Sequence, residues 1–364
     1  MNGELTPKDE LYSILSQFPS TTSHAFAYGS GVFEQKISDD DKVSSSSSSS
    51  SSDNMMDFIF ITPNAELWHR ECMIQRPKDY SLMAHWIGSK YVAKIGKMGA
   101  GLYFNPLVII HIPESSVGDP SHALDREHII MKKCIIKYGV MNEEQLKSDL
   151  KHWDTLYVAG RMQKPVSTLK SSDEVMDLQE RYNLQYAIST SLLLHTGKAK
   201  DCTIHTSDLY QTIASLSYMG DPRVTAGAED PNKIFKLVQS DGQMKRFHAL
   251  YKTQFERMEQ MGLLQRTSSS ERIEINLMDS SIRKALCHRL PPRLQSDVKE
   301  ITNSITASQN THDILHKTLK QSLTNIVGPP ARVQSVKGLF TAGLKKSIQY
   351  AAAKFRKGAL KGLL

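Results

Sequence analysis

The chain has 364 residues, of which 40% are hydrophobic and 23% charged, and its formal net charge is +7. This composition predicts a folded protein with a large core and an anionic partner, and it excludes a wholly disordered chain. The four cysteines lie far apart in the sequence, which argues against a zinc site or a disulfide framework. No apolar run approaches the roughly 20 residues of a membrane-spanning helix, and the N-terminus carries no positive targeting signal.

The first structural signal is an apolar run that ends in glycine. Residues 9–18 have the spacing of an amphipathic helix, and residues 24–28 are typical of a buried strand. Gly29-Ser30-Gly31 follows, where glycine allows a tight turn and a close approach of the backbone to a ligand. Ser30 offers a hydroxyl and an N–H to phosphate oxygens. Taken alone, this motif is more often a plain turn than a phosphate site.

The next strand, residues 55–61, carries one carboxylate, Asp57, inside an apolar run. A buried charge is costly unless it is paired or binds metal. A Gly-Ser turn followed by an acidic strand is how a nucleotidyltransferase holds a nucleoside triphosphate and Mg²⁺. We therefore predict that Gly29 and Ser30 bind phosphates, that Asp57 ligates Mg²⁺, and that Ser30 and Asp57 are the catalytic residues. An ion pair with a lysine or arginine, or a place on an edge strand, explains Asp57 equally well.

A serine tract over residues 44–52 separates these two strands. It has nothing to bury, so we predict a disordered insertion over about residues 36–53, at the tip of a loop between two strands that pair. Two-metal sites usually place a second carboxylate two residues further along the strand. Ile59 occupies that position, which leaves the remaining metal ligands unassigned.

The rest of the first domain, which we place at residues 1–170, alternates helical and extended patterns. Residues 68–94 are predicted to be mostly helical, with five large apolar side chains in the core. They are Trp68, Met83, Trp86, Ile87 and Tyr91. Strands are predicted at residues 107–110 and 134–140. Arg161 and Lys164, in a basic turn after the apolar run 156–160, either neutralise a triphosphate or are solvated.

Residues 174–290 are predicted to be mostly helical, and the clearest helices are residues 184–194 and 207–217. Thr206-Ser207-Asp208 is a candidate N-cap. Glu229 and Asp230 either extend the metal site or cap a helix that begins after Pro231. Pro291-Pro292 marks a further boundary.

The C-terminal segment is basic and amphipathic. No Asp or Glu follows Asp313, and apolar residues recur three or four apart from Phe340 onward. This pattern is typical of a helix that lies on an anionic bilayer, here over about residues 337–364. The alternative is a helix docked on its own protein. The residues assigned to the membrane are Lys337, Phe340, Leu344, Lys345, Lys346, Ile348 and Phe355.

Several short motifs occur in a specific order along the chain. They are residues 28–33 (YGSGVF), 56–60 (MDFIF), 99–105 (GAGLYFN), 136–140 (IKYGV), 156–165 (LYVAGRMQKP), 220–223 (GDPR), 228–233 (AEDPNK) and 337–347 (KGLFTAGLKKS). Through them the chain resembles, from about residue 20 to 355, the mitochondrial translocator assembly and maintenance family of phosphatidate cytidylyltransferases.

The resemblance implies an α+β fold. A nucleotidyltransferase domain with a mixed sheet (1–170) is followed by a mostly helical, winged-helix-like domain (171–292). A C-terminal region (293–364) then attaches to the matrix face of the inner mitochondrial membrane as a peripheral protein. It also implies that CTP and phosphatidate give CDP-diacylglycerol and pyrophosphate with Mg²⁺, for phosphatidylglycerol and cardiolipin synthesis.

On this resemblance, five cations are candidates for binding the CTP phosphates or the phosphatidate headgroup, and Ile59 belongs to the family's own pattern. The cations are Lys137, Arg161, Lys164, Arg223 and Lys233. Two other functions remain open: a nucleotidyltransferase acting on RNA, and a non-catalytic assembly factor anchored by the tail. No nucleic-acid partner is expected, because the basic residues concentrate in a tail with an apolar face. The sequence does not indicate the oligomeric state.

Overall fold

A computed structural model gives the fold. It describes residues 7–29, 31–33, 55–113, 131–195, 203–225, 233–267, 269, 271–304 and 309–341. The predicted insertion over residues 36–53 lies outside these residues, as do most of the predicted tail and the Ser30 half of the glycine turn.

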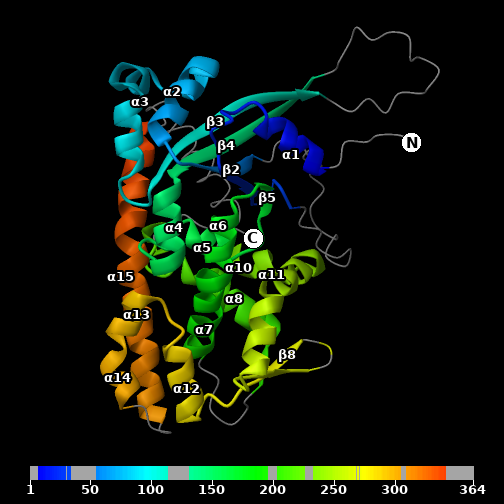
Figure 1. The fold of residues 1–364 in the computed structure, drawn as a ribbon, viewed down its shortest axis with the longest axis vertical. Helices are drawn as coiled ribbons and strands as arrows, with labels where there is room; N and C mark the ends of the chain where they lie inside the picture. Colours follow the sequence, from blue (N-terminus) through cyan, green and yellow to red (C-terminus); the bar gives the residue numbers. More distant parts are fainter. Residues whose placement is uncertain are drawn as a thin grey trace, which may run out of the picture.

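A five-stranded mixed sheet forms the upper part of the molecule (Figure 1), with the strand order β3-β4-β2-β1-β5. Its strands are β1 His24–Tyr28, β2 Met56–Thr62, β3 Leu102–Pro113, β4 Met131–Asn142 and β5 Ser167–Lys170. β2 and β4 run parallel, while the other neighbours are antiparallel. β1 pairs with β2, which confirms that the strands on either side of the serine tract are neighbours.

Helices from the N-terminal part of the chain cover one face of this sheet. They are α1 Pro7–Leu15, α2 Ala65–Gln75, the 3-10 turn Pro77–Asp79 and α3 Leu82–Gly96. An aromatic cluster fills the space beneath them, in which Phe18 lies 4.6 Å from Phe60 and 4.9 Å from Tyr138, ring centroid to ring centroid. Trp68 is fully buried there, as predicted.

Three of the five predicted core residues between 68 and 94 are instead on the surface. Met83 is 58% exposed, Trp86 86% and Tyr91 57%. α3 is not one straight helix: Gly88 has φ 77° and ψ 168°, which divides it into two segments. Helical spacing indicates that residues share a face, but it does not indicate what that face contacts.

The other face of the sheet packs on a helical layer that continues into the lower part of the molecule (Figure 1). Its helices are α4 Glu143–His152, α5 Ala159–Met162, α6 Asp173–Leu178, the π-helical turn Gln179–Asn183, α7 Leu184–Leu194, α8 Thr206–Leu216, α9 Pro222–Thr225, α10 Lys233–Gln239, α11 Asp241–Gln260, α12 Ser280–Cys287, α13 Pro292–Asp297 and α14 Lys299–Asn303. A small sheet, β6 Thr203–His205, β8 Arg272–Glu274 and β7 Gln265–Arg266, lies beside them.

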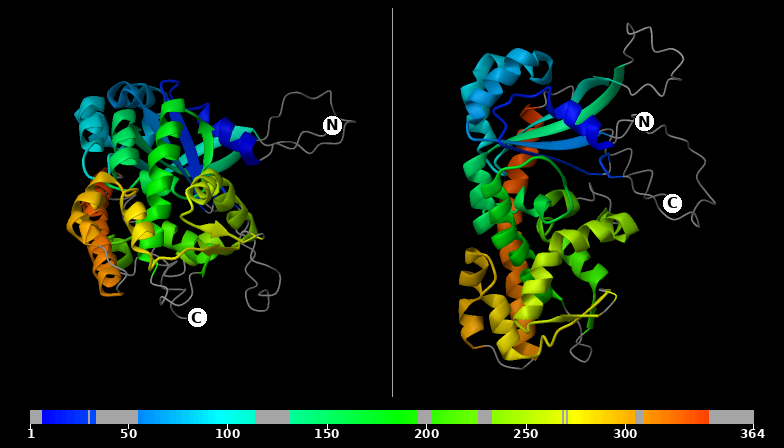
Figure 2. Two further views of the ribbon diagram at one scale, coloured as in Figure 1. Left: turned by 60° about the horizontal axis from the view of Figure 1, so that its bottom comes forward. Right: turned by 45° about the vertical axis from the view of Figure 1, so that its right-hand side comes forward.

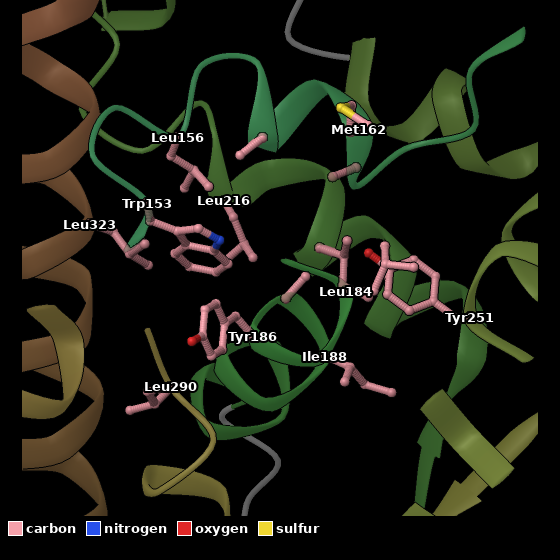
Figure 3. Packing of buried hydrophobic residues seen from close by; sticks show 14 of the residues in the cluster. Trp153, Leu156, Met162, Leu184, Tyr186, Ile188, Leu216, Tyr251, Leu290 and Leu323 are labelled. Carbon is pink, nitrogen blue, oxygen red and sulfur yellow. The ribbon is translucent and has the colours of Figure 1, made fainter. Parts of the chain in front are cut away.

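The α+β class and the helices α7 and α8 are confirmed. The predicted N-cap of α8 is wrong: the helix begins at Thr206, and its cap residue His205 makes no side-chain capping bond. The winged-helix description stays a prediction, as do the boundaries 1–170, 171–292 and 293–364. One apolar core runs from the sheet into the helical layer. Figure 3 shows Trp153 inside this core among residues of α7, α8 and α15.

The last described element, α15 Gln309–Thr341, has 33 residues and runs along the long axis of the molecule (Figures 1 and 2). It starts beside α13 and α14, buries Leu315, Leu319 and Leu323 in the helical core, and reaches β3. Its close approach to the turn before β3 requires glycine, because a Cβ at Gly99 would lie 2.7 Å from Cγ1 of Val333. None of the described helices is long and apolar enough to cross a membrane.

Candidate functional site

The glycine turn and the acidic strand meet as the sequence predicts. β1 ends at Tyr28, which lies opposite Asp57 of β2. Gly29 follows with φ 89°, and a Cβ there would lie 3.3 Å from Oδ2 of Asp57. A side chain at this position would therefore be strained and would also crowd the carboxylate. Ser30, the other predicted catalytic residue, lies outside the described residues.

Lys137 stands next to this carboxylate. It is aligned with Asp57 across the parallel β2–β4 pair, and its Nζ lies 3.9 Å from Oδ1 of Asp57. The same ammonium lies 4.2 Å from the centroid of the Phe104 ring, in a cation–π contact. The side chains of Lys137 and Asp57 are 19% and 24% exposed, so both can be reached from solvent. Asp57 is therefore close to a lysine and also accessible to a ligand, so its position agrees with both the ion-pair and the ligand interpretation.

Arg161 of α5 supplies a second cation. Its guanidinium lies 4.4 Å from the centroid of the Tyr28 ring. Burial alone would lower the pKa of Arg161, but the nearby Tyr218, Tyr28, Tyr157 and Asp57 raise it above the ordinary value. Burial, and then Asp57, raise the pKa of Tyr28, which keeps that phenol neutral. Arg161 is therefore a permanent positive charge beside Asp57 and the glycine turn.

The loop that leads into α5, and so to Arg161, is held by one buried carboxylate. Oδ1 of Asp149 accepts hydrogen bonds from the backbone N–H groups of Thr155 (2.8 Å) and Leu156 (2.9 Å), and Oδ2 accepts one from Ala159 (3.0 Å). Trp153 and Leu156 adopt φ values of 56° and 52°, which non-glycine residues rarely do. Such conformations persist only where the surroundings enforce them, and they cluster at functional sites.

Lys164 does not join the site. Its Nζ is buried and donates to the carbonyls of Gly160 (2.6 Å) and Ala214 (3.2 Å) and to Oγ of Ser217 (2.9 Å). This ammonium ties α5 to α8. The predicted phosphate contact of Lys164 is therefore wrong, because its donors are used to satisfy buried carbonyl oxygens.

Arg223 lies at the edge of the site. It forms a two-pronged ion pair with the buried carboxylate of Asp221, with Nη2 2.6 Å from Oδ2. Its guanidinium is 6.0 Å from the centroid of the Tyr157 ring. Its phosphate role stays a prediction. Glu229 and Asp230 lie outside the described residues, as does the side chain of Lys233, the first residue of α10.

A metal ion in this region would be held by Asp57. Ile59, which follows two residues later, packs in the apolar core with 2% exposure. Within the described parts of the chain, no group of three or more His, Cys, Asp or Glu side chains could hold a metal ion. Mg²⁺ nevertheless often binds through one or two carboxylates, with substrate phosphates and water completing the shell. A partly exposed carboxylate beside a turn with no side chain at Gly29 fits that mode.

Lys337, predicted to contact a membrane, is instead buried within the protein. Its Nζ donates to the carbonyl oxygens of Ile95 (3.2 Å), Gly96 (3.1 Å) and Met98 (2.7 Å) at the end of α3. The membrane assignment of Lys337 is wrong, because its ammonium satisfies the last carbonyls of a helix. The side chain of Phe340, and Leu344, Lys345, Lys346, Ile348 and Phe355, lie outside the described residues.

Sequence reasoning missed the aromatic lining and its support. Phe104 and Tyr157 flank the cations, and their rings lie 6.4 Å apart, centroid to centroid. Asp149 resembles any other carboxylate of an amphipathic helix, so no sequence pattern indicated its role. Tyr28 and Phe104 were available inside the ordered motifs, but only the pairing of β1, β2 and β4 places them around Asp57.

A carboxylate, two cations and a glycine turn meet at the junction of a mixed sheet and a helical layer, and together they form a candidate site for the phosphates of a nucleotide. The family model described as mitochondrial phosphatidate cytidylyltransferase matches residues 11–357. The chain therefore belongs to the mitochondrial phosphatidate cytidylyltransferase family.

Curated relatives agree over nearly the full length. A protein named mitochondrial phosphatidate cytidylyltransferase from Danio rerio is 32% identical over 94% of this chain and 93% of its own. Proteins with the same name from Caenorhabditis elegans and Schizosaccharomyces pombe are each 30% identical. The alignments cover 96% and 97% of this chain, and 98% and 84% of those proteins.

Proposed function

We propose that this protein is a phosphatidate cytidylyltransferase, which converts CTP and phosphatidate to CDP-diacylglycerol and pyrophosphate. A phosphate oxygen of phosphatidate attacks the α-phosphorus of CTP, and the bond to the β-phosphate oxygen breaks as pyrophosphate leaves. The observation that carries the proposal is the carboxylate of Asp57 against Gly29, with Lys137 and Arg161 on either side, in a chain of this family.

Each of these residues has a role in that reaction. Gly29 lets the phosphates approach the backbone at the end of β1, because it has no side chain. Lys137 and Arg161 offset the negative charge of the triphosphate and of the leaving pyrophosphate, in a partly buried site where charge interactions are stronger than in water. Asp57 would hold Mg²⁺, which when bound neutralises the phosphates and the charge that develops in the transition state.

We further propose that the enzyme is Mg²⁺-dependent and acts as a peripheral protein on the matrix side of the inner mitochondrial membrane. Its product there would serve phosphatidylglycerol and cardiolipin synthesis. The mitochondrial name of the relatives and the acid-free, amphipathic segment after Thr341 support this location.

The test is an assay of the purified full chain with CTP, Mg²⁺ and phosphatidate dispersed in detergent. We expect CDP-diacylglycerol and pyrophosphate in equal amounts, and no product with EDTA. Asp57→Asn should lower kcat by about 100-fold or more, the scale seen when a charge-stabilising group is removed. Asp177→Asn is the matched control, because Asp177 is half exposed and, within the described residues, its ion pair is with the exposed Arg181. Nucleotide transfer to RNA in place of phosphatidate, or no transfer at all, would refute the proposal.

A further inference from the structure

The first segment of α3 presents large apolar side chains to solvent. Leu82 is 89% exposed and Trp86 86%, and Met83 between them is 58% exposed. Leu82 and Trp86 are four residues apart, so they share one face of the helical turn. The break at Gly88 separates this turn from the rest of α3, and a Cβ at Gly88 would meet no atom within 4 Å.

Scattered exposed apolar residues need no explanation, but a cluster that includes tryptophan does. A contiguous apolar patch on a protein surface marks a protein or membrane interaction site. Tryptophan in particular favours positions with one apolar side and one wet side, such as the headgroup region of a bilayer. Tyr91, in the second segment of α3, is also 57% exposed.

Lysines line one side of a cavity at the second segment of α3. The second segment of α3 contributes Lys90, Lys94 and Lys97, and the cavity has a volume of about 280 Å³. The start of α2 and the end of β4 supply the other polar walls, Asn64, Glu66 and Asn142. Three ammonium groups against one carboxylate leave a net positive cavity, and no ion pair involves these lysines within the residues that the structure describes.

The described part of α15 ends near the same place. Lys337 donates to the carbonyls of Ile95, Gly96 and Met98, so the last turns of α15 lie against the end of α3. Figure 1 shows this end of α15 next to α3, away from α13 and α14. Two of these carbonyls flank Lys97, which lines the cavity. Residues 342–364, which follow α15 in the sequence, carry six Lys or Arg and no acid.

We propose that this face of α3 is a second membrane-docking surface, separate from the C-terminal segment. Leu82, Met83 and Trp86 insert at the level of the lipid headgroups and upper acyl chains. Lys90, Lys94 and Lys97 bind the phosphate of an anionic phospholipid. The inference rests on the proposed function, because an enzyme with a lipid substrate must work at a bilayer.

Charge favours a bilayer over a second copy of the chain. A second copy would place one lysine-lined cavity against another and bring together two chains that each carry a net charge of +7. Such a contact between like charges is unfavourable. An anionic bilayer offers both an apolar layer for the exposed side chains and phosphates for the lysines. It also offers one surface to both α3 and the segment that begins beside it.

Trp86 is a built-in probe for this contact. Of the three tryptophans, Trp68 and Trp153 are fully buried, whereas Trp86 is exposed. We expect vesicles of phosphatidylcholine with phosphatidylglycerol to shift the emission of the full chain to shorter wavelength. Brominated acyl chains should quench it, and Trp86→Ser should abolish both effects. A self-association surface would instead give a shift that depends on protein concentration without vesicles. That result, or an unchanged emission while the protein sediments with vesicles, overturns the proposal.

Variants separate the two parts of the surface. Lys90→Glu/Lys94→Glu should weaken binding to these vesicles by about tenfold or more, since each lysine near an anionic surface contributes on the order of 1 kcal/mol. Lys317→Glu/Lys320→Glu is the charge-matched control, because both lysines are exposed on the opposite half of α15. Equal loss of binding in the two variants would mean that only net charge matters, and would refute the docking surface.

An activity measurement distinguishes this inference from the proposed function. With phosphatidate in detergent micelles, Lys90→Glu/Lys94→Glu and Trp86→Ser should retain the kcat of the unaltered protein. With phosphatidate in vesicles, both should lose rate. Failure of the proposed function would appear as no product from any variant in either medium. Failure of the docking surface would appear as equal rates of all variants on vesicles.

Discussion

At the scale of single residues, burial decides which cations can serve a substrate. The family resemblance made Lys137 and Lys164 candidates alike. Lys137 is partly exposed beside Asp57, whereas the ammonium of Lys164 is enclosed by two carbonyls and a hydroxyl. Because buried polar groups must be satisfied, an enclosed lysine is committed to the fold. The residue type therefore indicates which chemistry is available, and the surroundings decide whether it is used.

Two buried histidines predict how stability depends on pH. Burial lowers the pKa of His24 to about 4 and that of His69 to about 3. In the unfolded chain both imidazoles take up protons near pH 6.5. Between about pH 6.5 and 4 the unfolded state therefore binds more protons, so the free energy of unfolding falls as the pH falls.

The expected slope is up to about 1.4 kcal/mol per pH unit for each of the two groups. Urea denaturation at pH 7.5, 6.5, 5.5 and 4.5 measures it. His69→Gln should reduce the slope, because a buried imidazole with a strongly lowered pKa is removed. A free energy of unfolding that stays constant over this range would contradict the prediction.

At the scale of elements, the buried carboxylate of Asp149 holds the loop between α4 and α5 in a rare backbone conformation. Four hydrogen bonds to Asp149, including one from Oγ1 of Thr155 at 3.1 Å, fix the segment that leads to Tyr157 and Arg161. Burial raises the pKa of Asp149, while these hydrogen bonds oppose that change. We therefore infer that the carboxylate positions Arg161.

We expect Asp149→Asn to lower the free energy of unfolding by about 1–3 kcal/mol, because its amide NH₂ replaces an acceptor that faces N–H groups. It should also lower kcat/KM for CTP in the folded enzyme, through displacement of Arg161. Chemical denaturation and kinetics under conditions where the variant is folded measure the two effects.

Asp154→Asn is the control for this variant, since Asp154 is an exposed residue of the same loop. If Asp149→Asn loses stability but keeps the full kcat/KM, the carboxylate supports the fold without positioning Arg161.

At the scale of the whole molecule, α15 joins the helical layer to the sheet. Its 33 residues extend over about 50 Å at 1.5 Å per residue. Lys337, near the end of α15, contacts the end of α3. The helix that precedes the proposed membrane segment is therefore part of the fold. The predicted membrane segment 337–364 therefore begins inside a structural contact.

This position changes how a deletion should be made. Removal of residues 342–364 keeps the contact of Lys337 and should leave the thermal midpoint of unfolding nearly unchanged. Because α3 provides a second surface, the deletion should weaken binding to anionic vesicles without abolishing it. Combined with Lys90→Glu/Lys94→Glu, it should abolish binding.

Vesicle sedimentation and thermal unfolding of the same samples measure these outcomes. The comparison is a shortened chain whose last residue is 336. Its thermal midpoint of unfolding should be lower, because the last carbonyls of α3 lose Lys337 as their donor. Complete loss of vesicle binding on removal of residues 342–364 alone would show that α3 adds nothing.

Much of the fold was predictable because local patterns set it. The apolar runs at residues 24–28 and 55–61 specify strands, and the spacing of residues 184–194 specifies a helix, wherever the chain packs. The pairing of β1 with β2, and with it the approach of Gly29 to Asp57, followed from reading the serine tract as an insertion. The exposure of Met83, Trp86 and Tyr91 was not predictable in this way, because an apolar face looks the same whether protein, lipid or water covers it.

The sequence by itself determined the α+β class, the family and the acidic strand beside a glycine turn, since each depends on the order of residues along the chain. Only the tertiary structure decided which charges meet at that turn. Arg161 lies beside that turn, and Asp149 holds the loop that leads to it. The ammonium groups of Lys164 and Lys337 instead donate to backbone carbonyls. The reason is physical: a buried charge needs partners, and those partners come from segments far apart in the sequence.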